Sequence, residues 1–147
     1  MAIYQLNLTV PQIRGGYPLI GNLSYEWHDG YAPAVLYGGD QILFKFDDGP
    51  LTLNFAVIRF TPKVNAMSAN PVTGAAGGTF PILDITDGEL TIREDFATSF
   101  PPNQLMSWCY AIYATFTGPD NQQYQYQLPD PEMVIVTGNP PPNATAY

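Results

Sequence analysis

Apolar and polar residues alternate with a period of two along most of this chain, and this pattern allows few folds. The first such stretch sets Tyr4, Leu6, Leu8 and Val10 on one face and Gln5, Asn7 and Thr9 on the other. Burial of one face only is typical of a strand in an antiparallel sheet. No stretch repeats apolar residues at the helical spacing of about 3.6 residues, so the sequence predicts an all-β fold.

Turn-forming clusters of Gly, Pro, Asn and Asp separate further alternating stretches. These stretches cover residues 23–27, 42–46, 51–60, 80–85, 89–96, 106–117, 122–128 and 133–136. In the stretch 51–60, Leu51, Leu53, Phe55 and Val57 are predicted to point inward, and the phase then changes at Ile58. Since one extra residue resets the alternation, we expect a β-bulge near Val57 and Ile58.

The number of strands and the spacing of their turns predict one domain, an antiparallel two-sheet β-sandwich of jelly-roll or immunoglobulin-like type. The chain has 147 residues, 46% of them hydrophobic, and so is long enough to bury a core. The sandwich is expected over residues 1–137, with a Pro-rich C-terminal tail over 138–147. Residues 61–79 are rich in Gly, Ala, Asn and Pro and predict a long loop of mobile or functional character.

The charge balance argues against several classes of partner. Thirteen acidic residues against 5 basic ones give a net charge of −8, which repels phosphate backbones and anionic membranes. The basic residues are scattered rather than clustered, so nucleic-acid binding is not expected. No apolar run is long enough for membrane insertion, and no signal peptide is visible. We therefore expect a cytoplasmic protein, with leaderless export as the open alternative.

The residues that usually carry catalysis or bind transition metals are scarce. Cys109 is the only cysteine and His28 the only histidine, so a disulfide, a blue-copper site and a zinc site all lack ligands. Cys109 has no neighbouring base in the sequence and is interpreted as a small buried residue rather than a nucleophile. Nothing marks a pair of carboxylates with separated pKa values. The prediction is that the protein is not an enzyme.

A cluster of aromatic and polar residues, Trp27, His28, Asp29 and Tyr31, is the candidate ligand-binding site. Sugars are held by an aromatic ring against their C–H face and by planar polar groups that bond their hydroxyls, and this turn contains both. The structural alternative places Trp27 in the core and leaves residues 28–30 as an ordinary turn. Both interpretations remain open from the sequence.

Acidic turns offer a second candidate site. Asp47 and Asp48 could supply oxygen ligands to calcium, although neither they nor the other acidic turns follow a known calcium-loop spacing. Ordinary turn roles are the favoured interpretation. No cofactor is therefore predicted, with calcium as the alternative.

Two stretches resemble a known family. One is residues 39–44 (Gly-Asp-Gln-Ile-Leu-Phe), and the other runs over 110–136, with Tyr124 and Tyr126 among glutamines and Asp130-Pro131 before the last apolar strand. Together they resemble the bacterial AidA/PixA inclusion-body protein family. The resemblance implies a β-sandwich, a bacterial source, no established enzymatic activity and an association with cytoplasmic inclusion bodies. The family's inclusion-forming members are methionine-rich, whereas this chain has 4 Met.

These observations predict a non-catalytic binding protein of AidA/PixA type, with lectin-like recognition of a carbohydrate or a similar small polar ligand. The alternative is a self-assembling cytoplasmic inclusion-body or storage protein. A surface with many Asn, Gln, Thr and Tyr and few charges suits both functions. A homo-oligomer is expected in either case, formed through strand edges or a face of tyrosines.

Overall fold

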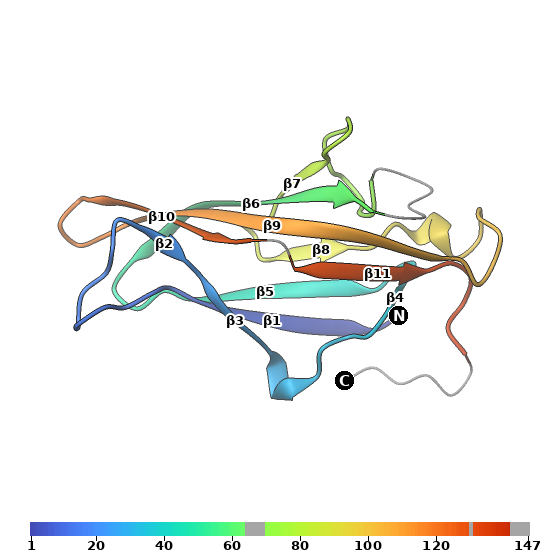
Figure 1. The fold of residues 1–147 in the computed structure, drawn as a ribbon, viewed down its shortest axis with the longest axis horizontal. Coiled ribbons are helices and arrows are strands. Elements are labelled where there is room, and N and C mark those ends of the chain that lie inside the picture. Colours follow the sequence, from blue (N-terminus) through green and yellow to red (C-terminus); the bar gives the residue numbers. More distant parts are fainter. Residues whose placement is uncertain (64–69, 130, 142–147) are drawn as a thin grey trace.

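The computed structural model describes residues 1–63, 70–129 and 131–141, which form two β-sheets with a shared hydrophobic core. Figure 1 shows the two sheets as layers, with β6, β9 and β10 in the upper layer and β1 and β5 in the lower one. The predicted all-β fold is confirmed. The only helical turns among the described residues are two short 3-10 turns, η1 (His28–Gly30) and η2 (Glu94–Phe96).

The smaller sheet has four strands in the order β3-β1-β5-β8. Their bounds are β1 (Ile3–Thr9), β3 (Ser24–Trp27), β5 (Gln41–Asp47) and β8 (Glu89–Thr91). β1 and β5 pair in parallel, which corrects the prediction of a purely antiparallel fold. Parallel pairing needs a long crossover, and the chain between β1 and β5 supplies one by passing through β2, β3 and β4.

The larger sheet has seven strands around the central β9 (Leu105–Thr117). β6 (Thr52–Pro62) lies along one side of β9, and β7 (Ile82–Asp84) pairs with β6. Along the other side, β10 (Gln123–Leu128) and β11 (Glu132–Val136) follow one another, and each pairs antiparallel with β9. Two short strands, β2 (Ile20–Asn22) and β4 (Leu36–Tyr37), pair in parallel with β10 and β11, so this sheet is also mixed.

The segment from β2 to β4 connects the two sheets along one side of the molecule. β2 belongs to the large sheet, and after Leu23, whose N–H donates to the Gln127 carbonyl at 2.7 Å, the chain enters the small sheet as β3. It then passes through η1 and returns to the large sheet as β4. Residues 28–35 therefore span the gap between an edge strand of each sheet.

The core consists of the inward faces of the two sheets. Its largest fully buried side chains include Trp108, Phe60, Phe96 and Phe116. Phe46 of β5 meets Phe116 of β9 edge to face, with ring centroids 6.0 Å apart, so the two sheets pack directly on each other. The inward face predicted for β1 is confirmed, because Tyr4, Leu6 and Leu8 are all buried.

The β-bulge in β6 lies earlier in the chain than predicted. The register between β6 and β9 shifts between Leu53 and Phe55, not at Val57 and Ile58. As a result Phe55 is 45% exposed rather than inward, while Ala56, Ile58 and Phe60 are buried. The break in alternation showed that this strand contains one extra residue. Apolar residues occur at both inward and outward positions of this segment, so the pattern could not show where the extra residue lies.

Two other predicted boundaries change. β6 continues to Pro62, into the predicted loop 61–79, of which residues 64–69 lie outside the described residues. The predicted strand over 89–96 stops at Thr91, and η2 follows it. In the predicted tail, residues 138–141 form no strand, and 142–147 lie outside the described residues. No helix formed by the described residues is long and apolar enough to cross a membrane.

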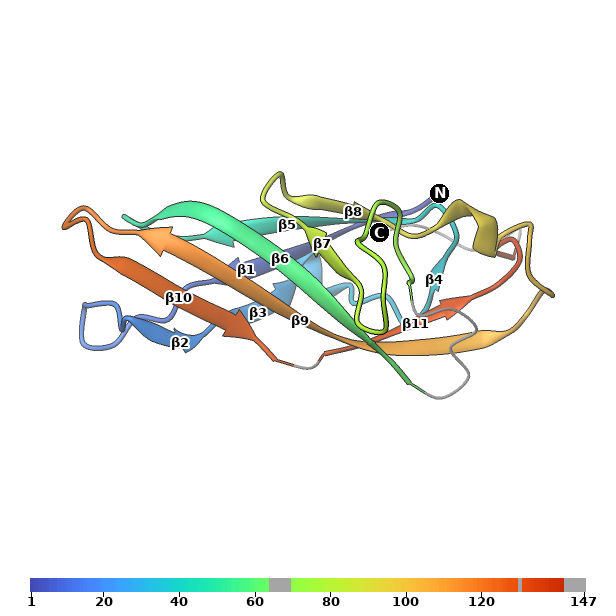
Figure 2. The same ribbon diagram turned by 90° about the horizontal axis from the view of Figure 1, so that it is seen from above.

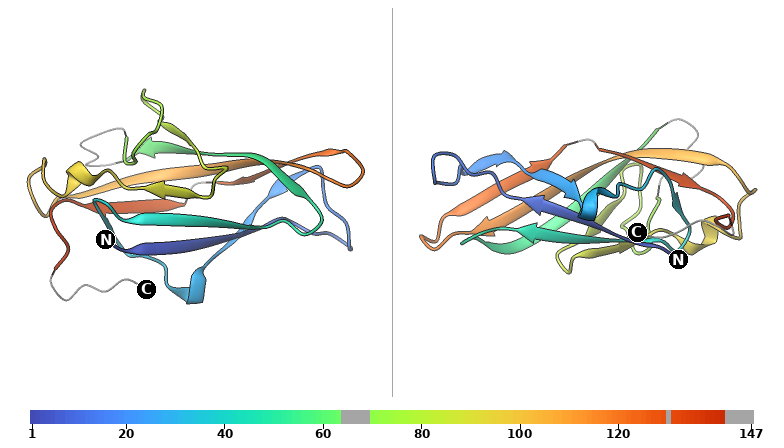
Figure 3. Two further views of the ribbon diagram at one scale, coloured as in Figure 1. Left: turned by 180° about the vertical axis from the view of Figure 1, so that it is seen from behind. Right: turned by 90° about the horizontal axis from the view of Figure 1, so that it is seen from below.

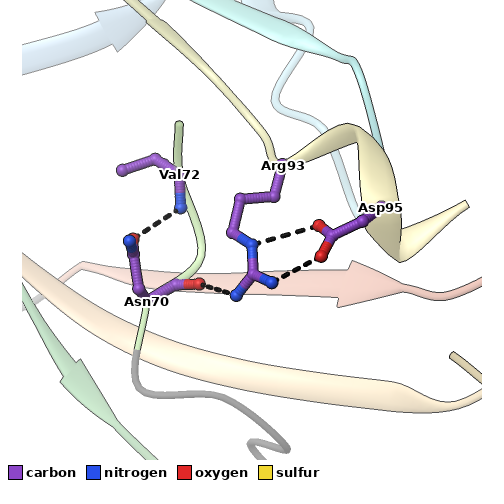
Figure 4. A network of polar contacts seen from close by, with 4 residues as sticks. All are labelled: Asn70, Val72, Arg93 and Asp95. Carbon is purple, nitrogen blue, oxygen red and sulfur yellow. Dashed lines mark hydrogen bonds and ion pairs between the residues drawn. The ribbon is translucent and has the colours of Figure 1, made fainter. Parts of the chain in front are cut away.

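Arg93 explains why the chain leaves the sheet after β8. Figure 4 shows its guanidinium reaching the Asp95 carboxylate with two nitrogens, with Nε 3.0 Å from Oδ1, while Nη1 donates to the Asn70 carbonyl at 3.1 Å. Asn70 Oδ1 in turn accepts the Val72 N–H at 3.0 Å. The guanidinium also lies over the Phe96 ring, 5.0 Å from its centroid. Arg93 thus holds η2 against the segment that follows residue 69.

Replacing Arg93 by Ala is expected to lower the free energy of unfolding by about 2 kcal/mol, because bidentate charge-assisted hydrogen bonds in a partly buried setting are lost. The measurement is urea unfolding monitored by tryptophan fluorescence. Arg14→Ala, which removes an exposed arginine, is the control and should change stability by no more than about 0.5 kcal/mol. Equal effects of the two substitutions would show that the Arg93 network contributes nothing beyond a surface charge.

Candidate functional site

A pocket of about 180 Å³ lies where the two sheets open along one side, between β3 of the small sheet and β11 of the large one. Figure 3 shows η1 and the following loop, which connect β3 of the small sheet to β4 of the large one. Part of the lining comes from β3 and the loop to β4, part from β9 and β11. The lining includes Tyr25, Trp27, Pro33, Tyr110, Glu132 and Met133.

Three aromatic rings give the pocket its shape. Tyr25 and Trp27 alternate along β3 opposite Leu8 and Leu6 of β1, so both face the interior side of the small sheet. Tyr25 is 51% exposed and stands at the mouth, whereas Trp27 is half-buried and packs against the core. Tyr110 of β9 closes the pocket from the large sheet and is only 5% exposed.

The hydroxyl of Tyr110 is the most informative polar group in the pocket. No hydrogen bond joins it to another described residue, and no fully buried side-chain oxygen among the described residues lacks a partner, so the hydroxyl is accessible from the pocket opening rather than sealed in the core. Burial away from water raises the pKa of the Tyr110 phenol, and the nearby Tyr25 phenol contributes to the increase. The hydroxyl therefore stays protonated at physiological pH and can donate a hydrogen bond to a group that enters the pocket.

Glu132 is the charged residue of the lining, but alternation along β11 places its side chain beside Cys109, on the face opposite the buried Met133. Its Oε2 accepts a hydrogen bond from Lys63 Nζ at 3.1 Å, and both side chains are about half exposed. This hydrogen bond and the charge of Glu132 raise the pKa of Lys63. The Glu132 carboxylate therefore lies with Lys63 on the outer face of the large sheet rather than inside the pocket.

Only one of the four residues predicted for the ligand-binding site lines this pocket. Trp27 does so, while His28, Asp29 and Tyr31 lie in and just after η1, outside the lining, and all three are exposed. His28 Nε2 lies 3.3 Å from Asp29 Oδ2, and Asp29 has a positive φ of 56°. The turn therefore presents its polar groups to the outside next to the mouth, and their role in binding stays a prediction.

Asp47 and Asp48 lie in the turn between β5 and β6. The Asp48 carbonyl accepts the Leu51 N–H at 3.0 Å, and the Asp47 carbonyl accepts the Val10 N–H at 3.1 Å. No group of three or more His, Cys, Asp or Glu side chains within residues 1–63, 70–129 and 131–141 is arranged to hold a metal ion. The observed contacts are those of a turn, and calcium binding at Asp47 and Asp48 stays a prediction.

Sequence reasoning missed Tyr25, Tyr110 and Glu132 as members of the pocket. Tyr25 left a signal, because it precedes Trp27 by two residues and a strand puts such a pair on one face. Tyr110 and Glu132 left none. Their approach to Trp27 depends on how β9 and β11 of one sheet pack against β3 of the other.

Comparison of this chain with protein-family models, with curated proteins and with solved structures finds no match. The AidA/PixA resemblance stated above therefore stays a prediction.

Proposed function

We propose that the protein is a non-catalytic, lectin-like binding protein that holds a carbohydrate or a similar polar ligand in the pocket between β3 and β11. The observation that carries the proposal is Tyr110, a residue only 5% exposed that lines this pocket and whose hydroxyl forms no hydrogen bond with another described residue. A hydroxyl at a pocket opening bonds water when the pocket is empty, and a ligand oxygen can take the place of that water.

The size and the chemistry of the pocket suit one sugar ring. Its volume of about 180 Å³ exceeds the roughly 150 Å³ in which a protein cavity can hold a six-membered ring. Tyr25 and Trp27 provide flat apolar surface for the C–H face of a pyranose. Tyr110 would donate to a ring or hydroxyl oxygen of the sugar. The ligand is therefore a single monosaccharide unit, at the end of a glycan or free.

Binding rather than hydrolysis is proposed because the lining contains a single carboxylate, Glu132. Glycoside hydrolysis ordinarily uses two carboxyl groups on either side of the bond that is cleaved. A two-sheet scaffold of jelly-roll or immunoglobulin-like type, in which strands rather than loops hold the aromatic rings, would keep such a pocket preformed.

A glycan-array screen of the purified protein, followed by calorimetric titration of the best ligand, tests this proposal. Tyr110→Phe removes one oxygen and is expected to weaken binding about tenfold, as the loss of one ligand hydrogen bond does. Tyr113→Phe is the matched control, because Tyr113 lies on the same strand but on the outer face of the sheet. It should bind as the wild type does.

Two results would contradict the proposal: a blank array, or equal affinities of Tyr110→Phe and the wild type. Asp29→Ala provides a second comparison. If Asp29→Ala lost binding and Tyr110→Phe kept it, the ligand would be assigned to the η1 turn predicted from the sequence instead of the pocket. Repeating the array with a chelator tests the calcium alternative, which predicts that the signal disappears.

The alternative function, self-assembly as a cytoplasmic inclusion-body protein, is supported by one observation, the exposed apolar residues on the outer face of the large sheet. This alternative predicts oligomers that grow without limit as the concentration rises. Light scattering over a concentration series distinguishes it from a closed complex, which stops growing at a fixed mass.

A further inference from the structure

The outer face of the large sheet carries a groove of about 300 Å³ between β2, β10, β9 and β6. Figure 2 shows this face from above, with β6, β9 and β10 lying side by side. Its most exposed apolar members are Ile20 at 77%, Phe55 at 45% and Tyr113 at 36%. The groove shares no lining residue with the pocket between β3 and β11, so this surface is independent of the proposed ligand site.

The bulge in β6 is the reason that Phe55 is exposed. In regular alternation Phe55 would follow Leu53 into the core, but the register shift between them turns its ring to the outer face. Asn54, within the bulge, donates from Nδ2 to Thr117 Oγ1 at 2.7 Å. A bulge interrupts the regular pairing of two strands, and bulges commonly serve to re-aim a side chain. Here the re-aimed side chain is a large aromatic ring placed in water.

The outer face of the small sheet is more polar. Apart from the exposed Ile3, it presents polar groups, with Gln5 Nε2 donating to Asn7 Oδ1 at 2.7 Å and Lys45 on the neighbouring strand. No residue lining the groove on the large sheet is charged, although the chain carries a net charge of −8. Three exposed apolar side chains gathered in one uncharged groove form a surface that another molecule can cover.

We propose that this face is covered by a second copy of the same chain, in a closed dimer in which the two large sheets pack face to face about a two-fold axis. Such an interface uses the same patch on both copies, so the patch must complement itself. The groove and the protruding Ile20 belong to one surface and provide both a hollow and a projection.

Charge limits where two copies can meet. Two molecules of charge −8 repel each other, so they associate most readily through the uncharged groove, where their acidic residues are not brought together. At the rim, Arg59 lies over the Tyr113 ring, 5.6 Å from its centroid, and has no ion pair among the described residues. Asp84 on β7 pairs with Val57, two residues before Arg59 on β6, and so lies on the same face of the sheet as Arg59. Because one face carries both a cation and a carboxylate, each copy in a two-fold dimer could form ion pairs with the opposite charges of the other copy.

Sedimentation velocity over about 1 μM to 1 mM tests the proposal, since this range covers dissociation constants from tight to weak. The wild type is expected to convert from monomer to dimer and to stop there. Phe55→Glu places a charge at the centre of both halves of the interface and is expected to weaken the dimer at least about tenfold. The matched control is Ile3→Glu, which changes an apolar residue of similar exposure, 47%, on the small sheet and should leave the dimer unchanged.

Circular dichroism confirms whether Phe55→Glu is folded, and Ile20→Glu, at a more exposed position, replaces it if not. A wild type that stays monomeric at 1 mM, or a dimer that persists in the folded face variant, would overturn the proposal. So would a glycan-array signal that Phe55→Glu abolishes and Tyr110→Phe retains, because it would assign the face to a glycan. A blank glycan array would contradict the proposed ligand pocket only. The dimer proposal would still be decided by sedimentation velocity.

Discussion

Replacing Trp108 by Ala is expected to lower the free energy of unfolding by about 4 kcal/mol, a large part of the stability of a small domain. Trp108 is fully buried on β9, between Pro62 of β6 and Met133 of β11 in the sheet. Its ring lies 6.1 Å from that of Phe96, which belongs to η2. The substitution removes apolar area and also leaves a cavity that the strands on both sides hold open.

Urea unfolding monitored by circular dichroism measures this effect, since the substitution removes one of the 2 tryptophans. Leu105→Ala is the control on the same strand. Leu105 is 60% exposed, so its truncation should cost no more than about 0.5 kcal/mol. A loss below about 1 kcal/mol for Trp108→Ala would place the indole outside the core and contradict the packing of η2 on β9.

Replacing Asp40 by Ala is expected to cost about 3 kcal/mol, the second largest effect. Asp40 is 3% exposed, and its Oδ1 and Oδ2 accept the Ala2 and Tyr37 N–H groups at 2.9 and 2.8 Å. Removing the carboxylate leaves both amides without this partner, and hydrogen bonds to charged groups are worth about 1.5–3 kcal/mol each. The Gly39-Asp40 pair that contributed to the family resemblance thus has a structural role here: it ties the start of β1 to the turn between β4 and β5.

Asp47→Ala is the control for Asp40→Ala, because it removes an exposed carboxylate from the other end of the same strand, β5. Its effect on unfolding in urea should be within about 0.5 kcal/mol. Hydrogen exchange of the Ala2 and Tyr37 amides gives a local measurement, since both should exchange faster in Asp40→Ala. Unchanged exchange at both amides would contradict the assigned hydrogen bonds.

The two proposals have a joint consequence for affinity. A face-to-face dimer would carry two pockets, one on each copy, and neither pocket shares residues with the dimer interface. Small pockets for a single sugar unit bind weakly alone, and two linked sites gain affinity for a surface that presents many copies of the ligand. Phe55→Glu is therefore expected to lower retention on an immobilised multivalent glycan while leaving the affinity for the free monosaccharide unchanged.

Local sequence patterns predicted most of the strands, because the polarity of successive residues records which side chains of a strand are buried. Alternation located β1, β5, β9 and β10 to within a residue or two, since inward and outward positions differ in polarity along them. It failed at Phe55, where both phases are apolar. It also could not find β2 and β4, which are too short to show a period and form only because β10 and β11 offer free edges.

The candidate site also consists of one residue that the sequence predicted and others that only the structure revealed. Trp27 was found because an aromatic residue beside a polar turn is visible in the sequence, but its ring faces the pocket while His28 and Asp29 face outward. The direction of each side chain depends on where β3 ends and η1 begins. Tyr110 looked like an ordinary core residue, since nothing in its neighbourhood along the chain shows that its hydroxyl meets an opening between the sheets.

The sequence by itself determined the all-β class, the positions of the long strands, the charge and the shortage of metal ligands, because these depend on residue type and on neighbours along the chain. The tertiary structure alone decided the parallel pairs, the opening between β3 and β11, and the outward position of Phe55. Each of these depends on which strands lie side by side. Contacts between distant segments are set by the packing of the whole core, and no local pattern records them.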